Sequence, residues 1–433
     1  MTPARLLVCV AVLLGSGCAG TSGEVSATSS SAAVTTTLPP ATTTTLPPTT
    51  TSTLPVFSVR GSVTREDGTP LARAFVTMGE TKAVTGADGW FAFETTHPEG
   101  MTVAKPGWSS VDVAWDTSTS FFQVTLAPQK IRGLRVSAEA AADDAKFDEL
   151  LTLADETAVN ALVFDSKQEE GKILYESSVE GTREIGAVDP VYDPAARIGQ
   201  AHAHGLYAIT RVVTFVDGAR ASAVPEEKLA GPWLDPASAG ARGYLLSVAA
   251  EACRLGFDEV QFDYVRYPSG NTARSTGQLD MSQEERVAVI AGFLAEAAQI
   301  LHPMGCAVAA DVFGIVTSVS DDQGLGQRPE ELSDAVDVLS PMIYPSHYSP
   351  GWIGFEDPNE HPYEVTSDAI ADALPRMAPG SVLRPYLQAF WWTDDQIRRS
   401  IQAAEDHGVG WMLWNVRSSF EREALPGDDE VAP

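Results

Sequence analysis

One stretch decides the fold of this 433-residue chain: Gly256-Phe257-Asp258-Glu259-Val260-Gln261-Phe262-Asp263-Tyr264-Val265-Arg266-Tyr267-Pro268. Apolar Val260 and Phe262 alternate with Gln261 and Asp263 at the period of a β-strand. One face should therefore pack outward, while the other points polar groups into the interior or mouth of a barrel. Because Pro268 cannot donate to a sheet ladder, it ends the strand. The stretch predicts a barrel strand that ends in a carboxylate, a phenol and a guanidinium.

The same strand-then-helix arrangement recurs from residue 131 to the end of the chain. The short β-runs span residues 133–137, 161–165, 207–213, 259–263, 307–311, 338–344, 383–390 and 410–415. Alternating strands and helices imply a parallel sheet with helical crossovers, and eight repeats favour a closed barrel, which takes about 250 residues. No glycine-rich phosphate loop follows the first run, which disfavours a nucleotide-binding sheet. We predict an α/β protein with a (β/α)8 TIM barrel over residues 131–425.

Two segments without a folded core precede this region. Residues 1–18 carry Arg5, an apolar run and then Gly15-Ser16-Gly17-Cys18, a pattern typical of an export signal. The last four residues resemble a bacterial lipobox, with Gly15 where Leu is usual, and this resemblance implies a lipid anchor on Cys18; secretion with cleavage nearby is the alternative. Residues 19–55 repeat Thr-Thr-Thr-Leu-Pro-Pro and predict a disordered, extended stalk.

Residues 56–128 hold short β-runs separated by turn signals about every ten residues, which predicts a small all-β sandwich. Their pattern, with Gly61-Ser62-Val63, Asp67-Gly68-Thr69-Pro70-Leu71 and Gly86-Ala87-Asp88-Gly89, resembles the carboxypeptidase regulatory-like domain, a transthyretin-like sandwich. Because the Asp and Gly residues of this pattern serve turns, we interpret the segment as a spacer or accessory module without chemistry.

The chain is strongly acidic, with 29 basic against 58 acidic residues and a formal charge of −29. Such a charge repels nucleic acid and anionic membrane surfaces and argues against polyanionic substrates, so a neutral or cationic ligand is easier to accommodate. After the leader, no segment approaches about 18 continuous apolar residues. We therefore predict no nucleic-acid partner and membrane association only through a lipid anchor.

Cysteine and histidine offer little for metal binding. Only Cys253 and Cys306 fall in the folded region, near neighbouring strands at the bottom of the barrel, where export would permit a disulfide; two buried thiols are the alternative. His202 and His204 are two residues apart and face different sides of a helix. Nucleotide, nicotinamide, serine-elbow and His-Glu-x-x-His motifs are missing, so the sequence predicts no metal and no cofactor.

The chemistry should gather where the barrel strands end, since barrel enzymes place their catalytic groups at the carboxyl ends of strands. Carboxylates among aromatic rings are what glycosidic cleavage requires. The candidate catalytic residues are Asp263, Asp311 and Asp165. The candidate substrate-binding residues are Lys167, Arg211, Tyr264, Arg266, Tyr344, His347, Gln388, Trp391, Trp414 and Asn415. Each aromatic residue taken alone could instead belong to the core.

Roles can be assigned to the carboxylates from their neighbours. Asp263 is the expected nucleophile or charged stabiliser, because Arg211 and Arg266 can hold it ionised. Asp311, on the adjacent strand, is the expected acid/base. The two roles could be exchanged, and Asp165 could replace either residue. Glu259, at the start of the same strand as Asp263, should lie near the bottom of the barrel and be structural.

The region from about Arg132 to Phe420 resembles a bacterial family of uncharacterised barrels classed with the glycoside hydrolases. The resemblance rests on the stretch quoted first and on Asn160 to Lys167, Trp233-Leu234-Asp235-Pro236, Ala310 to Gly314 and Ser340 to Tyr348. It implies a relationship to the alpha-amylase-like barrels, in which a fourth-strand Asp is the nucleophile. The fifth-strand acid of those enzymes is usually Glu, whereas this chain offers Asp311.

The sequence thus predicts an exported, surface-anchored glycoside hydrolase that acts on an extracellular or cell-envelope polysaccharide or oligosaccharide. The alternative is a catalytically inactive surface protein that binds carbohydrate. A metal-dependent hydrolase or deacetylase would require a His/Asp ligand cluster at the mouth, and no suitable spacing exists.

Overall fold

The structure is a computed structural model that describes residues 55–116, 118–119 and 121–432. The predicted leader, the lipobox-like Cys18 and nearly all of the predicted stalk lie outside the described residues.

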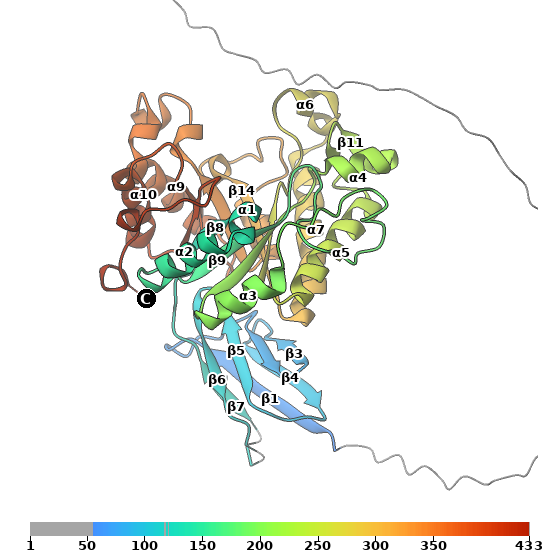
Figure 1. Cartoon of the computed structure of the whole chain (residues 1–433), viewed down its shortest axis with the longest axis vertical. Helices are drawn as coiled ribbons and strands as arrows, with labels where there is room; N and C mark the ends of the chain where they lie inside the picture. Colours follow the sequence, from blue (N-terminus) through green and yellow to red (C-terminus); the bar gives the residue numbers. More distant parts are fainter. Residues whose placement is uncertain (1–54, 117, 120, 433) are drawn as a thin grey trace, which may run out of the picture. The chain divides into compact units, whose positions relative to one another are not determined.

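Residues 57–125 form an all-β region with its own hydrophobic core (Figure 1). One sheet has the order β4-β1-β7 and the other the order β3-β2-β5-β6. Buried Val59, Val76 and Val103 belong to the core that the strands share. The strands are β1 (Phe57–Thr64), β2 (Phe75–Met78), β3 (Thr81–Val84), β4 (Trp90–Thr95), β5 (Met101–Lys105), β6 (Trp108–Val113) and β7 (Phe122–Thr125). The predicted small all-β module is confirmed.

The remaining residues form a closed ring of parallel strands. The strands are β8 (Arg132–Val136), β9 (Ala161–Lys167), β10 (Tyr207–Val213), β13 (Glu259–Asp263), β14 (Ala307–Phe313), β15 (Val338–Ile343), β16 (Val382–Leu383), β17 (Tyr386–Gln388) and β18 (Trp411–Trp414). Each pairs in parallel with its neighbours along the ring, β16 and β17 share the seventh position, and pairing of β18 with β8 closes the ring. The predicted (β/α)8 barrel is confirmed.

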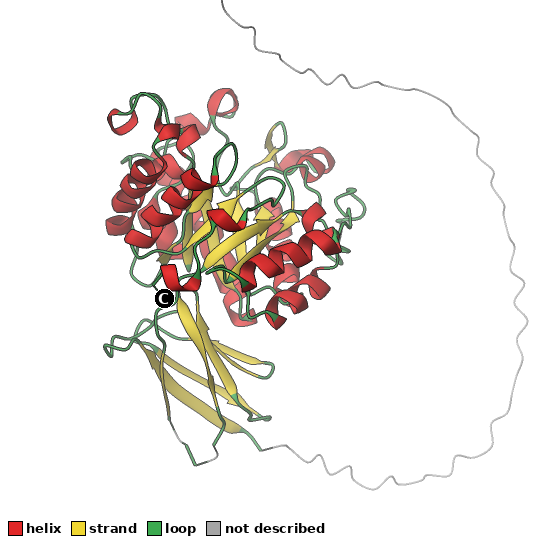
Figure 2. Ribbon diagram, turned by 60° about the vertical axis from the view of Figure 1, so that its left-hand side comes forward, coloured by secondary structure: helices red, strands yellow, loops and turns green. Residues whose placement is uncertain are grey.

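Helices surround these strands, as Figures 1 and 2 show. They are α1 (Ala138–Ala142), α2 (Asp144–Asp155), α3 (Pro194–Ala203), α4 (Gly218–Ala223), α5 (Ala239–Arg254), α6 (Gly270–Ser275), α7 (Gln283–Leu301), α8 (Pro329–Ala335), α9 (Pro362–Ala373) and α10 (Asp394–Asp406). A short antiparallel pair, β11 (Lys228–Ala230) and β12 (Trp233–Leu234), lies between α4 and α5 in the chain. The longest helix, α7, starts at a capping box between Ser282 and Glu285.

The segment of α7 and its following turn, Gln283–Met304, is long and apolar enough to cross a membrane by length and composition alone. Its side chains pack instead against the barrel. Phe293 meets Phe262 of β13 with ring centroids 5.3 Å apart, and Ile290 and Leu294 are fully buried in the same cluster. This apolar character is that of a helix packed on a barrel.

Strand β13 has the alternation that its sequence predicts. Val260 and Phe262 pack outward against the helices. The polar residues of the same strand meet interior partners: Glu259 pairs with Arg384, and the Gln261 side chain accepts a hydrogen bond of 2.8 Å from the Tyr386 hydroxyl. Glu259 is therefore structural, as expected, because its charge is matched inside the barrel.

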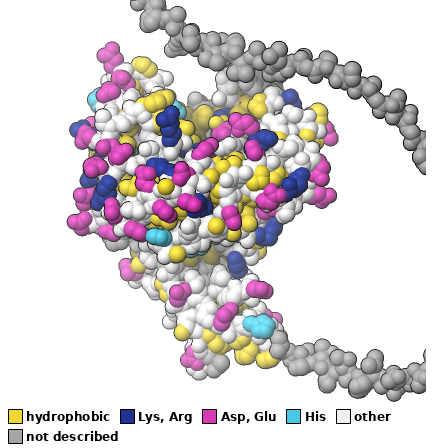
Figure 3. Space-filling model, in the orientation of Figure 1, with side chains coloured by type: hydrophobic (Ala, Val, Ile, Leu, Met, Phe, Trp, Pro, Cys, Tyr) yellow, Lys and Arg dark blue, Asp and Glu magenta, His cyan; other side chains and the backbone are white. Residues whose placement is uncertain are grey.

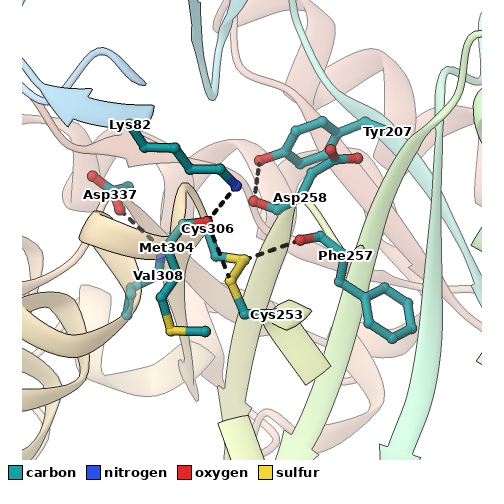
Figure 4. Close-up of a disulfide and its surroundings, with 9 residues drawn as sticks. All are labelled: Lys82, Tyr207, Cys253, Phe257, Asp258, Met304, Cys306, Val308 and Asp337. Atoms are coloured by element: carbon teal, nitrogen blue, oxygen red, sulfur yellow. Dashed lines mark hydrogen bonds between the residues drawn. A yellow bond between two sulfur atoms is a disulfide. The ribbon is translucent and has the colours of Figure 1, made fainter. Parts of the chain in front are cut away.

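Cys253 at the end of α5 and Cys306 just before β14 form a disulfide, with Cα atoms 6.0 Å apart (Figure 4). The sequence left open whether these two cysteines form a disulfide or remain buried thiols, and in the structure they form the disulfide. Because Cys306 precedes the amino end of β14, the disulfide lies at the end of the barrel opposite the carboxyl ends of the strands.

Acidic side chains are scattered over the barrel face drawn in Figure 3, with Lys and Arg between them. On this face the acidic side chains are therefore spread out rather than gathered in one patch.

Candidate active site

A cavity of about 690 Å³ opens at the carboxyl ends of the barrel strands. Its wall combines charged groups with aromatic rings. The charged residues are Glu169, Arg211, Asp263, Arg266 and Asp311. The aromatic residues are Tyr264, Phe313, Tyr344, His347, Tyr348, Trp352, Tyr386 and Trp414, and the remaining lining residues are Gly314, Ile315, Gln323, Met342 and Ser349. The cavity lies where a (β/α)8 barrel carries its chemistry.

Asp263, the last residue of β13, is held by two kinds of donor. Nε and Nη2 of Arg211 lie 2.8 and 2.7 Å from its Oδ2, and the backbone N–H of Tyr264 donates to Oδ1 over 2.6 Å. Both carboxylate oxygens therefore have partners, one of them a full positive charge.

Asp311 has the opposite surroundings. It lies one residue beyond Ala310, which pairs with Phe262, so Asp311 and Asp263 occupy neighbouring positions on adjacent strands. Asp311 is 1% exposed, and neither of its carboxylate oxygens has a hydrogen-bond partner among the described residues. Burial, followed by the charge of Asp263, raises the pKa of Asp311 well above its usual range. These surroundings favour the protonated form of Asp311.

Arg211 organises the acidic side of the site. Besides Asp263, it contacts Glu169 over 2.8 Å and Asp165 over 3.4 Å. Burial acts to raise the pKa of Glu169, but the Arg211 charge and hydrogen bond together bring it below its usual value. Arg211 thus holds several carboxylates in fixed positions around one guanidinium.

Arg266 does not make the ion pair with Asp263 that the sequence suggested. It donates one hydrogen bond, from Nη1 to the carbonyl oxygen of Tyr267 over 3.0 Å, and Arg211 takes the place beside Asp263. The reason is geometric: Arg211 comes from β10, which is paired with β13, whereas Arg266 follows the end of β13 and turns toward a group of aromatic rings.

Backbone strain marks the turn that carries these residues. Tyr264 has a φ of 52°, a value that non-glycine residues rarely adopt. The unusual conformation directly follows Asp263 and brings the Tyr264 N–H onto that carboxylate. Strain of this kind persists where the surrounding structure fixes it, and it clusters at functional sites.

The aromatic residues differ in what they offer to a ligand. Tyr344 packs edge-on against His347 with ring centroids 5.3 Å apart, and burial lowers the pKa of His347, which favours its neutral form. The Trp414 ring already has the guanidinium carbons of Arg135 and Arg211 at 4.2 and 4.9 Å from its centroid. Part of its surface is therefore engaged by the protein itself.

Eight predicted site residues line the cavity, and five do not. Asp165 is fully buried and pairs with Arg135 and Arg211. Lys167, also fully buried, pairs with Asp217 at 2.9 Å. Both residues lie on β9, where buried side chains of opposite charge pair with them. Neither residue is part of the cavity wall.

Three further predicted residues lie outside the cavity wall. The Gln388 side chain donates to Asn359 and to the Phe390 carbonyl, and the Asn415 side chain donates to the Ala389 carbonyl over 2.6 Å. Both amides therefore support neighbouring loops. Trp391 is 85% exposed and has a φ of 61°. Its neighbour Phe390 contacts both Trp391 and cavity-lining Tyr344, so the ring stands beyond the cavity wall.

Some lining residues escaped the sequence-based list of candidates. Met342 and Tyr386 lie on barrel strands, where strict inward alternation would have identified them. Glu169 follows β9, and no pattern in the neighbouring sequence predicts its ion pair with Arg211. Trp352 lies in the loop after β15, where the sequence does not alternate as a strand does. Within the described residues, no group of three or more His, Cys, Asp and Glu side chains could hold a metal ion.

A closed barrel with carboxyl groups, arginines and aromatic rings at the carboxyl ends of its strands has the architecture of a barrel enzyme. Residues 133–420 match the family model described as "Putative glycosyl hydrolase domain". The match spans more than half of the chain, which therefore belongs to this family.

Several solved structures are similar to this chain. The glycoside hydrolase domain of PgaB (BpsB) from Bordetella bronchiseptica aligns with a TM-score of 0.50 and 12% identity, over 67% of this chain and 95% of that one. A hypothetical protein from Ruminiclostridium thermocellum is 32% identical over 41% of this chain and 97% of its own, with a TM-score of 0.36. The glycoside hydrolase domain of PelA from Pseudomonas aeruginosa aligns with a TM-score of 0.40 and 12% identity. The alignment covers 67% of this chain and 97% of that one. No protein of curated function matches the chain.

Proposed function

We propose that this protein is a glycosidase that hydrolyses an O-glycosidic bond of a polysaccharide, with Asp263 and Asp311 as its carboxyl pair. The observation that carries the proposal is the difference between these neighbours. Asp263 accepts from Arg211 and Tyr264, while Asp311 has no partner and a raised pKa. Two adjacent carboxyl groups in contrasting environments are suited to separate acid and nucleophile roles.

In this mechanism Asp311 donates its proton to the glycosidic oxygen as the bond to the anomeric carbon breaks. Asp263 attacks the anomeric carbon or stabilises the developing positive charge there. A water molecule completes the reaction by giving its hydroxyl to the anomeric carbon and returning a proton to the carboxyl pair. Arg211 is a positioning residue, because it acts through Asp263.

Substrate contacts would come from the cavity-lining candidates Tyr264, Arg266, Tyr344, His347 and Trp414, and from the exposed ring of Trp391. Rings of this kind stack on the apolar faces of sugars. An open mouth lined by aromatic residues and an exposed tryptophan beyond it favour a polymeric substrate over a free monosaccharide.

The test is to incubate the purified full chain with a panel of cell-envelope and extracellular polysaccharides and to measure new reducing ends. Asp263→Asn should lower the rate by at least about a thousandfold on the glycan that the wild type cleaves. Asp148→Asn, on the exposed side of α2, is the matched control and should retain the rate. Cleavage that survives Asp263→Asn would refute the assignment. Binding of a glycan without any cleavage would favour the carbohydrate-binding alternative.

We also propose that the protein is exported and held at the cell surface through Cys18. The support is the leader pattern in the sequence together with the Cys253–Cys306 disulfide, a bond that persists in oxidising compartments. The resemblance of residues 56–128 to a carboxypeptidase regulatory-like domain agrees with an accessory role on an extended stalk. Metabolic labelling with radioactive palmitate should mark the wild type and leave Cys18→Ala unlabelled; label in both would count against the anchor.

A further inference from the structure

Arg266 is a buried cation on the cavity wall whose charge is not matched by an ion pair. It is 6% exposed and donates one hydrogen bond, from Nη1 to the Tyr267 carbonyl oxygen. The described residues give it no carboxylate at ion-pair distance. The two other arginines beside the cavity differ, since Arg135 pairs with Asp165, and Arg211 pairs with Asp263 and Glu169.

Aromatic rings surround this guanidinium. Its central carbon lies 4.4 Å from the ring centroid of Phe313, 4.8 Å from that of Trp233 and 5.2 Å from that of Tyr264. Burial lowers the pKa of Arg266 to about 10, against an opposing effect of the Asp263 charge. Arg266 is therefore still a cation at neutral pH. A cation removed from water in this way is costly unless an anion approaches it.

Two nitrogens of the Arg266 guanidinium are not used by the described part of the protein. Nη1 is occupied, whereas Nε and Nη2 have no hydrogen-bond partner among the described residues and are not among the buried unpaired atoms. Arg266 itself lines the cavity, from which a ligand would approach these nitrogens. The Nε–Nη2 edge of an arginine presents two parallel N–H donors, a spacing that matches a planar carboxylate.

We propose that the cavity binds a saccharide that carries a carboxylate, as in a uronic acid, and that Nε and Nη2 of Arg266 donate to that carboxylate. The inference rests on the proposed function, because it names the substrate class of the same site. It also refines what net charge alone indicates. A charge of −29 opposes a densely charged polyanion at long range, but a single carboxylate inside the cavity meets a local cation.

The experiment uses matched pairs of tetrasaccharides that differ only at the carboxylate. The probes are tetrasaccharides of β-1,4-glucuronan, α-1,4-galacturonan and β-1,4-mannuronan, each beside its carboxyl-reduced counterpart. Binding to the full chain is measured by calorimetry at a fixed, near-physiological ionic strength. In at least one pair the wild type should bind the acidic member about tenfold more tightly than the reduced one.

Arg266→Met should abolish that preference, so that the acidic and the reduced member of the pair bind with affinities within about twofold of each other. Arg266→Lys keeps the charge without the paired donors and should retain only part of the preference; it carries the test if the Met variant does not fold. Arg399→Met removes an exposed arginine of α10 and should bind as the wild type does. Equal binding within every pair, or a preference that survives Arg266→Met, overturns the proposal.

Binding is measured in the Asp263→Asn background as well, where hydrolysis is suppressed. A chain that shows the preference but cleaves nothing refutes the glycosidase and retains the carboxylate site. A chain that cleaves glycans without any preference for the acidic members refutes the carboxylate site and retains the glycosidase. The two proposals can therefore fail separately.

Discussion

Arg211 on β10 places two nitrogens, Nε and Nη2, at 2.8 and 2.7 Å from one oxygen of Asp263 on β13. The two strands are paired in the ring, with Val213 opposite Asp263, so the contact is fixed by sheet register rather than by a loop. The same guanidinium reaches Glu169 and Asp165. One buried cation thus lies among three carboxylates that would otherwise repel each other, and Arg135 shares Asp165 with it.

Arg211→Met should therefore destabilise the protein strongly. The substitution leaves the buried Asp263 carboxylate without its counter-ion, a change that costs about 3–5 kcal/mol in comparable buried pairs. Chemical denaturation followed by tryptophan fluorescence measures the loss in free energy of unfolding. Arg399→Met, which breaks an exposed pair with Asp395, should cost less than about 1 kcal/mol. Similar small losses for both variants would show that Arg211 does not balance the cluster.

Asp311→Asn should remove general acid catalysis. Because burial and Asp263 raise the pKa of Asp311, the wild-type acid should stay protonated well above the usual range of an aspartic acid, and the rate should fall only at higher pH. The Asn variant should lose about 10²–10⁴ in kcat on natural glycans and lack that alkaline limb. Aryl glycosides with strongly acidic leaving groups, which need no protonation, should be cleaved at nearly the wild-type rate. An equal loss on both substrates would assign the acid role elsewhere.

The same substitution should stabilise the fold at neutral pH. The folded-state pKa of Asp311 is raised above the unfolded value of about 3.9, so the folded protein binds the additional proton. Stability is therefore fully present below the unfolded pKa and declines by up to about 1.4 kcal/mol per pH unit as the pH rises toward the folded pKa. Asn does not titrate. The difference in Tm between Asp311→Asn and the wild type should grow from pH 4 to pH 7, and a constant difference would contradict this account.

Trp391→Ala should weaken the use of long substrates. The ring is 85% exposed and held in a strained backbone conformation beyond the cavity wall, where a polysaccharide leaving the cavity could stack on it. A loss of about 1 kcal/mol corresponds to a roughly fivefold higher KM on polymer, with kcat unchanged and little effect on a disaccharide glycoside. Trp90→Ala, at an exposed tryptophan of β4, is the matched control. Equal effects of the two variants would exclude a specific platform.

Removal of the disulfide should lower stability and spare activity. The bond joins residues 53 apart in sequence, and closing a loop of that length stabilises a protein by about 2–4 kcal/mol. It lies at the end of the barrel away from the cavity. Cys253→Ala/Cys306→Ala should therefore unfold at lower denaturant concentration, while kcat/KM at 25 °C stays within about twofold. Loss of activity at a temperature where the variant is folded would contradict this separation of roles.

Local pattern was sufficient for most of the fold. Strand alternation in the Gly256–Pro268 stretch predicts which side chains of β13 face the helices, and the eight β-runs agree with the barrel strands to within a few residues. The alternation of apolar and polar residues and the residues that end a strand are local properties of the sequence. They can therefore be recognised without knowing which strands pair. The seventh strand is the exception in detail: it is divided at Arg384-Pro385, because proline cannot donate to the ladder.

The sequence by itself determined that acidic, basic and aromatic groups gather at strand ends, since parallel strands deliver their carboxyl ends to one mouth. Only the tertiary structure decided how these groups pair. Arg211 reaches Asp263 because their strands are neighbours, which leaves Arg266 with aromatic rings and Asp311 without a partner. Asp165 and Lys167 do not line the cavity, because each forms an ion pair with a buried residue of opposite charge. Pairing depends on distances between residues far apart in the chain, and electrostatic interactions in a buried site are set by those distances.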